Sequence, residues 1–203
     1  MDEQAAFEQL AGASTAAISD AMFRMGHKDR TMRARIKPID PAMTVAGPAF
    51  TVQCYPGGTH ACSRAMKAVE AGKVLVIDGG GFVEAVLWGE IFSRMAMVKG
   101  VRGTVVDGAV RDVEQVRALG YPLFAAGIHP GAGTGDKLGE IGIPVQCGGV
   151  VVHPDDWVFG DVLGVVVVPA AWLGEVAERC RDVLEKEAKL IADLDAKLGR
   201  PRV

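Results

Sequence analysis

Between residues 59 and 126, short and almost wholly apolar runs alternate with segments of helical spacing. The apolar runs lie at 74–78, 104–107 and 122–126. Runs this uniformly apolar predict strands that are buried on both faces and pair in parallel. Helices are expected between and before them, at about 59–71, 84–99 and 112–118. The alternation therefore predicts an α/β fold around a parallel sheet.

The flanking segments complete the expected element order. Residues 7–24 predict two short helices, and 43–55 predict a strand bent at its Gly-Pro step. Segments 145–153 and 157–168 are expected to be antiparallel strands joined by a turn at 154–156, followed by a terminal helix at about 172–198. A chain of 203 residues without an evident linker predicts a single domain over residues 1–203.

Composition disfavours several classes of partner. The net charge is −3, lysine and arginine are dispersed, and aromatic residues make up 6% of the chain, so nucleic-acid binding is not expected. The apolar runs are too short to span a bilayer, and the first residues lack the basic start and apolar core of a signal peptide. A cytoplasmic protein without membrane contact is expected.

Cysteine, histidine and glycine spacings point to no metal cluster and no nucleotide site. The four cysteines and four histidines lack zinc-site spacing, which favours buried reduced thiols and structural or exposed imidazoles. The glycine-rich stretch 131–136 lacks the third glycine of a dinucleotide fingerprint. Glycines 79–81 follow a predicted strand and precede a predicted helix, which fits either an anion-binding loop or a simple turn.

The strongest chemical signal is Glu90, followed after twenty residues by Arg111 and Asp112. Arg111 and Asp112 follow a predicted strand, and α/β proteins place ligands at that carboxyl edge of the sheet. An arginine fork for a carboxylate beside a hard oxygen ligand for a divalent metal suits chemistry on a small keto acid. The alternative is a surface ion pair with a solvated helix glutamate. No lysine is placed for a Schiff base, because Lys73 and Lys99 border the opposite ends of the elements.

Several stretches of the chain resemble a known family. They are residues 15–22, 45–52, 74–81, 88–90, 100–127, 143–156 and 164–169. Together they resemble the family of the ribonuclease activity regulator A, which also contains the 4-hydroxy-4-methyl-2-oxoglutarate aldolases. The spacing of Glu90 and Arg111-Asp112 is similar to that of the aldolase branch, where aspartate is often found in place of Glu90.

The resemblance implies a fold and a site. The implied fold is a three-layer β/β/α sandwich of the swivelling-domain type, assembled as a homotrimer or a dimer of trimers with sites between subunits. Arg111 would bind the keto acid, and Asp112 would hold Mg²⁺ or Mn²⁺ directly or through water. Glu187 of a neighbouring subunit would approach the metal. The substrate carboxylate would bind the backbone of four consecutive residues, Gly89, Glu90, Ile91 and Phe92.

The implied activity is that of a divalent-metal-dependent class II aldolase. Such an enzyme cleaves a 4-hydroxy-2-oxo acid to pyruvate and a second oxo compound, and it also decarboxylates oxaloacetate. Arg111, Asp112 and Glu90 would be its catalytic residues, with a water near Glu90 or Glu187 as the base. The alternative that the resemblance implies is a non-catalytic regulator that binds and inhibits a ribonuclease.

Overall fold

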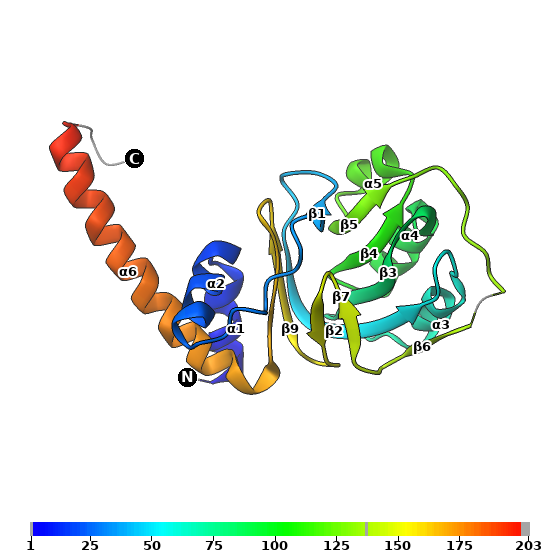
Figure 1. Cartoon of the computed structure of the whole chain (residues 1–203), viewed down its shortest axis with the longest axis horizontal. Coiled ribbons are helices and arrows are strands. Elements are labelled where there is room, and N and C mark those ends of the chain that lie inside the picture. The colour runs from blue at the N-terminus through cyan, green and yellow to red at the C-terminus, as the bar shows by residue number, and fades with distance from the viewer. Residues whose placement is uncertain (1, 137, 200–203) are drawn as a thin grey trace.

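The computed structural model describes residues 2–136 and 138–199, which form one large mixed sheet, a small hairpin and helices on several sides (Figure 1). The helices are α1 (Glu3–Ala11), α2 (Thr15–Arg24), α3 (His60–Ala68), α4 (Glu90–Val98), α5 (Val113–Leu119) and α6 (Leu173–Leu198), with a 3₁₀ turn at Ala170–Trp172. The strands are β1 (Lys37–Pro38), β2 (Val45–Cys54), β3 (Val74–Trp88), β4 (Gly103–Val110), β5 (Leu123–Ile128), β6 (Gly139–Ile141), β7 (Val145–Cys147), β8 (Val150–Val152), β9 (Trp157–Asp161) and β10 (Gly164–Val168). The expected mixed α/β fold is confirmed.

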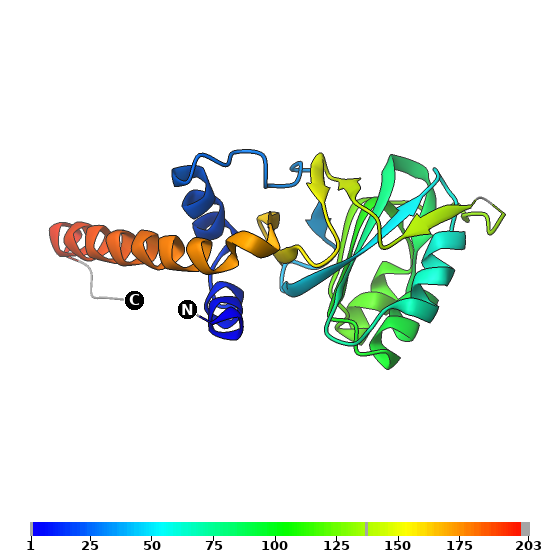
Figure 2. The ribbon, with the colours of Figure 1, turned by 90° about the horizontal axis from the view of Figure 1, so that it is seen from below.

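Strands β2, β3, β4 and β5 pair in parallel and form the centre of the sheet, as the apolar runs predicted. Their side chains alternate between two cores. Leu75 and Ile77 of β3 pack beneath helices α3, α4 and α5, whereas Val74 and Val76 face the opposite side. That opposite side is covered by the β7–β8 hairpin and by β9–β10, which gives a layer of helices, a sheet and a second β layer (Figure 2).

Helices α1 and α2 and the start of α6 cover the outer face of β9–β10. Trp157 and Phe159 of β9 pack into this third core, and Phe7 of α1 lies 4.8 Å from Trp157 between ring centroids. The rest of α6 extends away from the sheets (Figure 1). Its exposed large apolar side chains are Leu184, Leu190, Ile191, Leu194 and Leu198.

Strand β2 is bent, as its Gly-Pro step predicted, and belongs to two parts of the sheet. Its residues from Val45 to Pro48 pair antiparallel with β9, and those from Ala49 onward pair parallel with β3. Proline has no N–H to give to a ladder, so Pro48 marks the place where one pairing ends and the next begins.

The expected loop at glycines 79–81 is wrong, and so is the expected helix start at residue 84. Strand β3 continues through these glycines to Trp88, with irregular register against β4, and α4 begins at Glu90. Neither the anion-binding loop nor the simple turn before a helix is present. A Cβ on Gly79 would lie 2.4 Å from Leu87 Cδ1 and 2.8 Å from the Asp107 carbonyl oxygen, so glycine is required by the close passage of the chain.

The expected pairing of segment 145–153 with segment 157–168 is also wrong. Each segment folds back on itself instead, as β7–β8 and as β9–β10. Gly148 and Gly149 connect β7 to β8 with φ values of 57° and 84°, the backbone of a tight two-residue hairpin. The turn at 154–156 therefore leads from the hairpin to a strand that pairs with β2.

All four cysteines are free thiols with buried side chains, as expected. Within residues 2–136 and 138–199, no helix has the length and apolar character needed to cross a membrane.

Asp161, at the end of β9, connects the first residue of α2 to the sheet through hydrogen bonds. Its carboxylate accepts hydrogen bonds from Thr15 N at 2.8 Å, Thr15 Oγ1 at 2.7 Å and Leu163 N at 2.8 Å. Burial raises the pKa of this carboxyl group, but the bonds from Thr15 and Leu163 favour its charged form and lower the pKa overall.

We predict that Asp161→Asn destabilises the protein by about 1 kcal/mol at neutral pH. Because the folded state depresses the pKa of Asp161, its contribution is full above the unfolded-state pKa of about 3.9 and is lost as pH falls through the folded-state pKa. Urea unfolding at pH 7 and at progressively lower pH measures the difference. The exposed Asp29→Asn is the control, and an Asp161→Asn deficit that does not shrink in acid would contradict the prediction.

Candidate active site

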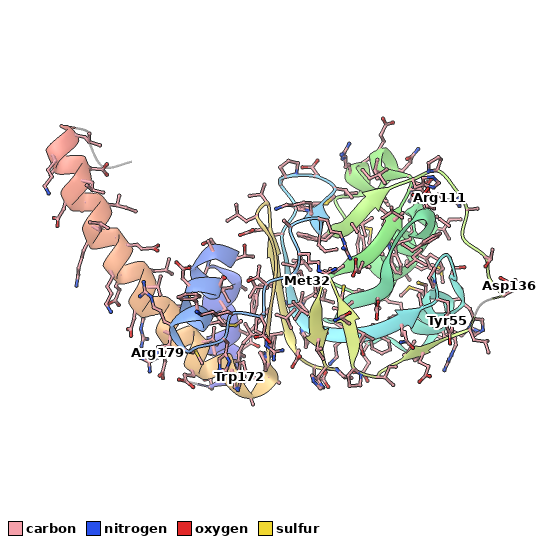
Figure 3. All side chains as sticks on the ribbon, viewed as in Figure 1. Met32, Tyr55, Arg111, Asp136, Trp172 and Arg179 are labelled. Carbon is pink, nitrogen blue, oxygen red and sulfur yellow. The ribbon has the colours of Figure 1, made fainter. Side chains whose placement is uncertain are left out.

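A cavity of about 290 Å³ lies where β3 and β4 end. Its wall is formed by residues 86–89 of β3 and the following turn, by Ile91 and Phe92 of α4, and by Arg111 and Asp112 after β4. Thr59, Ala132 and Gly133 close the remaining side. Figure 3 shows Arg111 on the part of the molecule opposite to α6. The expected placement of Arg111 and Asp112 at the carboxyl edge of the sheet is the one observed.

Asp112 has an unusual backbone conformation. Its φ and ψ are 54° and 37°, in the left-handed region, and it directly precedes α5. Its carbonyl oxygen accepts the first helical hydrogen bond from Val116 N at 3.0 Å. The carboxylate Oδ2 accepts a hydrogen bond from Glu90 N at 3.2 Å and lies 3.6 Å from Arg111 Nε. This conformation is uncommon for residues other than glycine, and such strain is concentrated at functional sites.

Gly89 allows the carboxylate to approach α4. A Cβ on this residue would lie 2.7 Å from Asp112 Oδ2 and 3.2 Å from Arg111 Cγ. Its φ of −167° is ordinary extended backbone, so glycine is required here for space. Any side chain at this position would displace the Asp112 carboxylate.

The first turn of α4 offers backbone donors to the cavity. Glu90 N is bonded to Asp112, and Ser93 N donates to Gly89 O, which leaves the N–H groups of Ile91 and Phe92 without a helical partner. No side chain caps this helix, and both residues line the cavity. Free N–H groups at the positive end of a helix dipole bind carboxylates and other anions.

Buried hydrogen bonds hold this turn in place. Trp88 Nε1 donates to Ser93 Oγ at 3.0 Å, and Ser93 Oγ donates to Gly89 O at 3.0 Å. Trp88 also stacks on Phe92, with ring centroids 5.1 Å apart. Sequence reasoning did not identify Ser93, because an isolated serine within a helix carries no distinctive signal.

The two glutamates implied by the resemblance lie differently. The Glu90 carboxylate pairs with Arg94 one turn along α4, at 2.7 Å, so the structure brings its backbone and not its carboxylate to Asp112. Glu187 is exposed on the part of α6 that extends away from the sheets, and this chain does not bring it to its own cavity (Figure 1).

The side chains around the cavity can be compared with the ligands that the implied Mg²⁺ or Mn²⁺ ion requires. In the part of the chain that the structure describes, no group of three or more His, Cys, Asp and Glu side chains is arranged to hold an ion. Asp112 is the carboxylate on the cavity wall, and no hydrogen bond to its Oδ1 is recorded among the described residues. Mg²⁺ commonly binds through one or two carboxylates and keeps several waters, so the single Asp112 carboxylate is compatible with a largely hydrated Mg²⁺ or Mn²⁺ ion.

A second hollow of about 340 Å³ adjoins the first and shares Arg111 and Asp112 with it. Ile128, His129 and Pro130, which follow β5, form its other side. Sequence reasoning treated His129 as structural or exposed. Its position just after a parallel strand was the signal that could have placed it at the same sheet edge.

The protein is of the α/β class, with helices on one face of a parallel sheet, strands on the other and a cavity at the carboxyl edge, where α/β proteins commonly bind ligands. The chain belongs to the RraA-like family, described as Aldolase/RraA, whose family model matches residues 15–167.

Individual relatives agree with this membership. A protein of Halalkalibacterium halodurans named "putative 4-hydroxy-4-methyl-2-oxoglutarate aldolase" is 36% identical over 90% of this chain and 82% of its own length. An uncharacterized protein of Methanocaldococcus jannaschii is 45% identical, but the match spans 58% of this chain and only 56% of that protein. The crystal structure of Streptomyces coelicolor RraAS2, described as an unusual member of the RNase ES inhibitor RraA protein family, is similar with a TM-score of 0.82. It is 28% identical, and the match covers 92% of this chain and 96% of that one.

We predict that Ser93→Ala lowers the free energy of unfolding by about 1–3 kcal/mol, because the buried indole N–H of Trp88 loses its acceptor. Urea unfolding measures this effect. Ser19→Ala is the control, since Ser19 Oγ makes an exposed contact with Thr31 and its removal should change stability by less than about 0.5 kcal/mol. Equal effects of the two substitutions would show that Ser93 does not support the turn.

Proposed function

We propose that the protein is a divalent-metal-dependent lyase that cleaves a 4-hydroxy-2-oxo acid to pyruvate and a second oxo compound. The observation that carries the proposal is the meeting of Arg111, Asp112 and the free N–H groups of α4 on one cavity. A cationic fork, a hard oxygen ligand and an anion-binding helix start are the groups that a 2-oxo acid requires.

The substrate would be oriented by its own carboxylate. In this proposal the carboxylate accepts hydrogen bonds from Ile91 N and Phe92 N, and the 2-oxo oxygen faces Arg111. The apolar walls supplied by Trp88 and Phe92 reduce the access of water to the reacting carbons. Asp112, with Glu187 of a neighbouring subunit, would hold Mg²⁺ or Mn²⁺, which when bound supplies Lewis-acid stabilisation of negative charge on oxygen.

The proposed bond cleavage depends on groups that stabilise the negative charge of the enolate oxygen. When the 4-hydroxyl proton is removed, the C4 oxygen forms a carbonyl group and the C3–C4 bond breaks. The electron pair of that bond forms the enolate of pyruvate. The Arg111 guanidinium stabilises the enolate oxygen as its charge develops. The proton passes to water oriented by Glu90 or Glu187, and the same water returns a proton to C3 of the enolate, which gives pyruvate. Glu90 must leave Arg94 to take part. Oxaloacetate decarboxylation gives the same enolate, so we expect it as a side activity.

The proposed role of Glu187 requires an oligomer, and we propose a homotrimer or a dimer of trimers. The exposed apolar side chains on the outer half of α6 support an association through this helix. Light scattering would test the oligomeric state, and a monomer at micromolar concentration would remove Glu187 from the site.

The second candidate is a non-catalytic regulator that binds a ribonuclease. The similarity to Streptomyces coelicolor RraAS2 favours it. The arrangement of Arg111 and Asp112 around a small cavity separates the two functions, since protein binding does not require it. Pyruvate release from oxaloacetate and from 4-hydroxy-4-methyl-2-oxoglutarate, with Mg²⁺ and with EDTA, tests the choice.

We predict that Asp112→Asn lowers metal-dependent turnover at least about 100-fold, because it removes the negative charge while asparagine still tolerates left-handed backbone. Pyruvate release from oxaloacetate is measured across a Mg²⁺ titration, and calorimetry with Mn²⁺ measures metal binding directly. Asp29→Asn, at an exposed position, is the matched control. Near-normal turnover and Mn²⁺ binding in Asp112→Asn would remove Asp112 from the metal site.

We predict that Arg111→Lys lowers kcat by about 10²–10³ and changes KM less, because the ammonium cannot reproduce the fork that meets the developing oxyanion. Steady-state kinetics with the same substrates give both constants, and Arg24→Lys on the exposed side of α2 is the control. A rise in KM with unchanged kcat would mean that Arg111 binds substrate and transition state equally.

A further inference from the structure

His129 is held rigidly beside the cavity. Its backbone N–H donates to Val110 O at 3.0 Å, and its ring Nδ1 accepts a hydrogen bond from Gly131 N at 3.0 Å. Gly131 O in turn accepts from Val86 N at 3.0 Å, which ties this segment to the cavity wall. A Cβ on Gly131 would lie 2.8 Å from the imidazole ring, so the ring position depends on glycine there.

These contacts determine which nitrogen of the His129 ring carries the proton. Because Nδ1 accepts a hydrogen bond, the proton of the neutral imidazole must be on Nε2. His129 Nε2 is therefore a donor and cannot be the base that removes a substrate proton. Glu84 Oε2 lies 4.0 Å from His129 Nε2, too far for a hydrogen bond, and the Glu84 side chain is 74% exposed.

The place of His129 relates this donor to the substrate. It lines the second hollow, which shares Arg111 and Asp112 with the first cavity. In the proposed binding mode, with the C1 carboxylate at the start of α4 and the oxo group at Arg111, the C4 substituents would extend into this adjoining hollow, which His129 lines. The Arg111 guanidinium and the His129 Nε2–H are the donors on the wall of that hollow, and Asp112 is the carboxylate beside Arg111.

We infer that His129 is a specificity-determining residue that donates a hydrogen bond from Nε2 to a carboxylate on C4 of the substrate. This inference rests on the proposed function. It selects 4-hydroxy-2-oxo dicarboxylates over analogues in which the C4 carboxylate is replaced by an apolar group, since the donor at the hollow would then be unpaired.

The test compares two substitutions. In His129→Asn the side-chain oxygen still accepts from Gly131 N but the Nε2 donor is gone, whereas His129→Gln supplies an amide donor near the place of Nε2. Aldol cleavage of 4-hydroxy-4-methyl-2-oxoglutarate and of 4-hydroxy-4-methyl-2-oxopentanoate gives kcat/KM for a dicarboxylate and a matched monocarboxylate. We expect His129→Asn to lower the dicarboxylate-to-monocarboxylate ratio about 10- to 100-fold and His129→Gln to retain most of it.

Glu84→Gln is the control for an ion pair within the protein. If the function of His129 were to bind Glu84, this substitution would reproduce the effect of His129→Asn, and the inference would be overturned. Equal losses on both substrates in His129→Asn would overturn it as well, because they would indicate a purely structural role.

A binding measurement separates this inference from the proposed function. Calorimetric titration with 2-oxoglutarate and with 2-oxopentanoate, neither of which has a 4-hydroxyl group to support cleavage, compares the same two end groups without turnover. If the wild-type protein cleaves neither aldol substrate but prefers 2-oxoglutarate, and His129→Asn loses that preference, the proposed function fails and the role of His129 is retained. A wild-type protein with no such preference overturns the role of His129 whether or not it is an aldolase.

Discussion

The whole architecture depends on the hydrogen bonding of one strand, β2, which is shared between two sets of neighbours. Its first half is paired with β9 and its second half with β3, so the two β layers are joined by continuous chain. All three apolar cores meet on it. Val45 and Ala49 enter the core between the layers, Ala46 packs against the core beneath α1 and α2, and Val52 and Cys54 enter the core beneath α3.

This arrangement explains why the site lies at one particular edge. Pairing with β2 fixes β3, and β3 fixes β4, so that Trp88 and Arg111 emerge side by side, with Arg111 N donating to Trp88 O at 3.1 Å. The position of α4 is set by Gly89 and by the buried bonds of Ser93, which is why site geometry and core packing are inseparable there.

The strands and helices that can be predicted best from the sequence are those whose local residue pattern agrees with their tertiary contacts. The uniformly apolar runs form parallel strands. Arg111 and Asp112, which follow the strand predicted at 104–107, lie at the carboxyl edge of the sheet because their position follows from the strand direction alone. The two N-terminal helices also form as expected, each with a side-chain cap, from Asp2 and from Ser14.

The errors arose where distant contacts override a local signal. Glycines 79–81 carry a turn signal, but they form an irregularity within β3, which resumes its pairing with β4 at Phe82 and continues to Trp88, so no helix begins there. The turn signal at 154–156 predicts a hairpin because the pairing of β9 with β2 leaves no local signal, whereas the hairpin turn lies at Gly148 and Gly149. The position of Glu90 on a helix is predictable from the local pattern, but the ion pair between its carboxylate and Arg94 is not.

The left-handed backbone conformation of Asp112 lowers the stability of the protein, whereas its carboxylate serves the proposed activity. An aspartate in this conformation costs on the order of 1 kcal/mol that glycine would not, and Asp112 and Asp155 are the non-glycine residues with positive φ in the described chain. Asp112→Gly would relieve this backbone strain, but it would also remove the acceptor of the Glu90 N–H and the carboxylate of the cavity. The unfolding midpoints of the two proteins would measure the balance between the strain of this backbone and the contacts of the carboxylate.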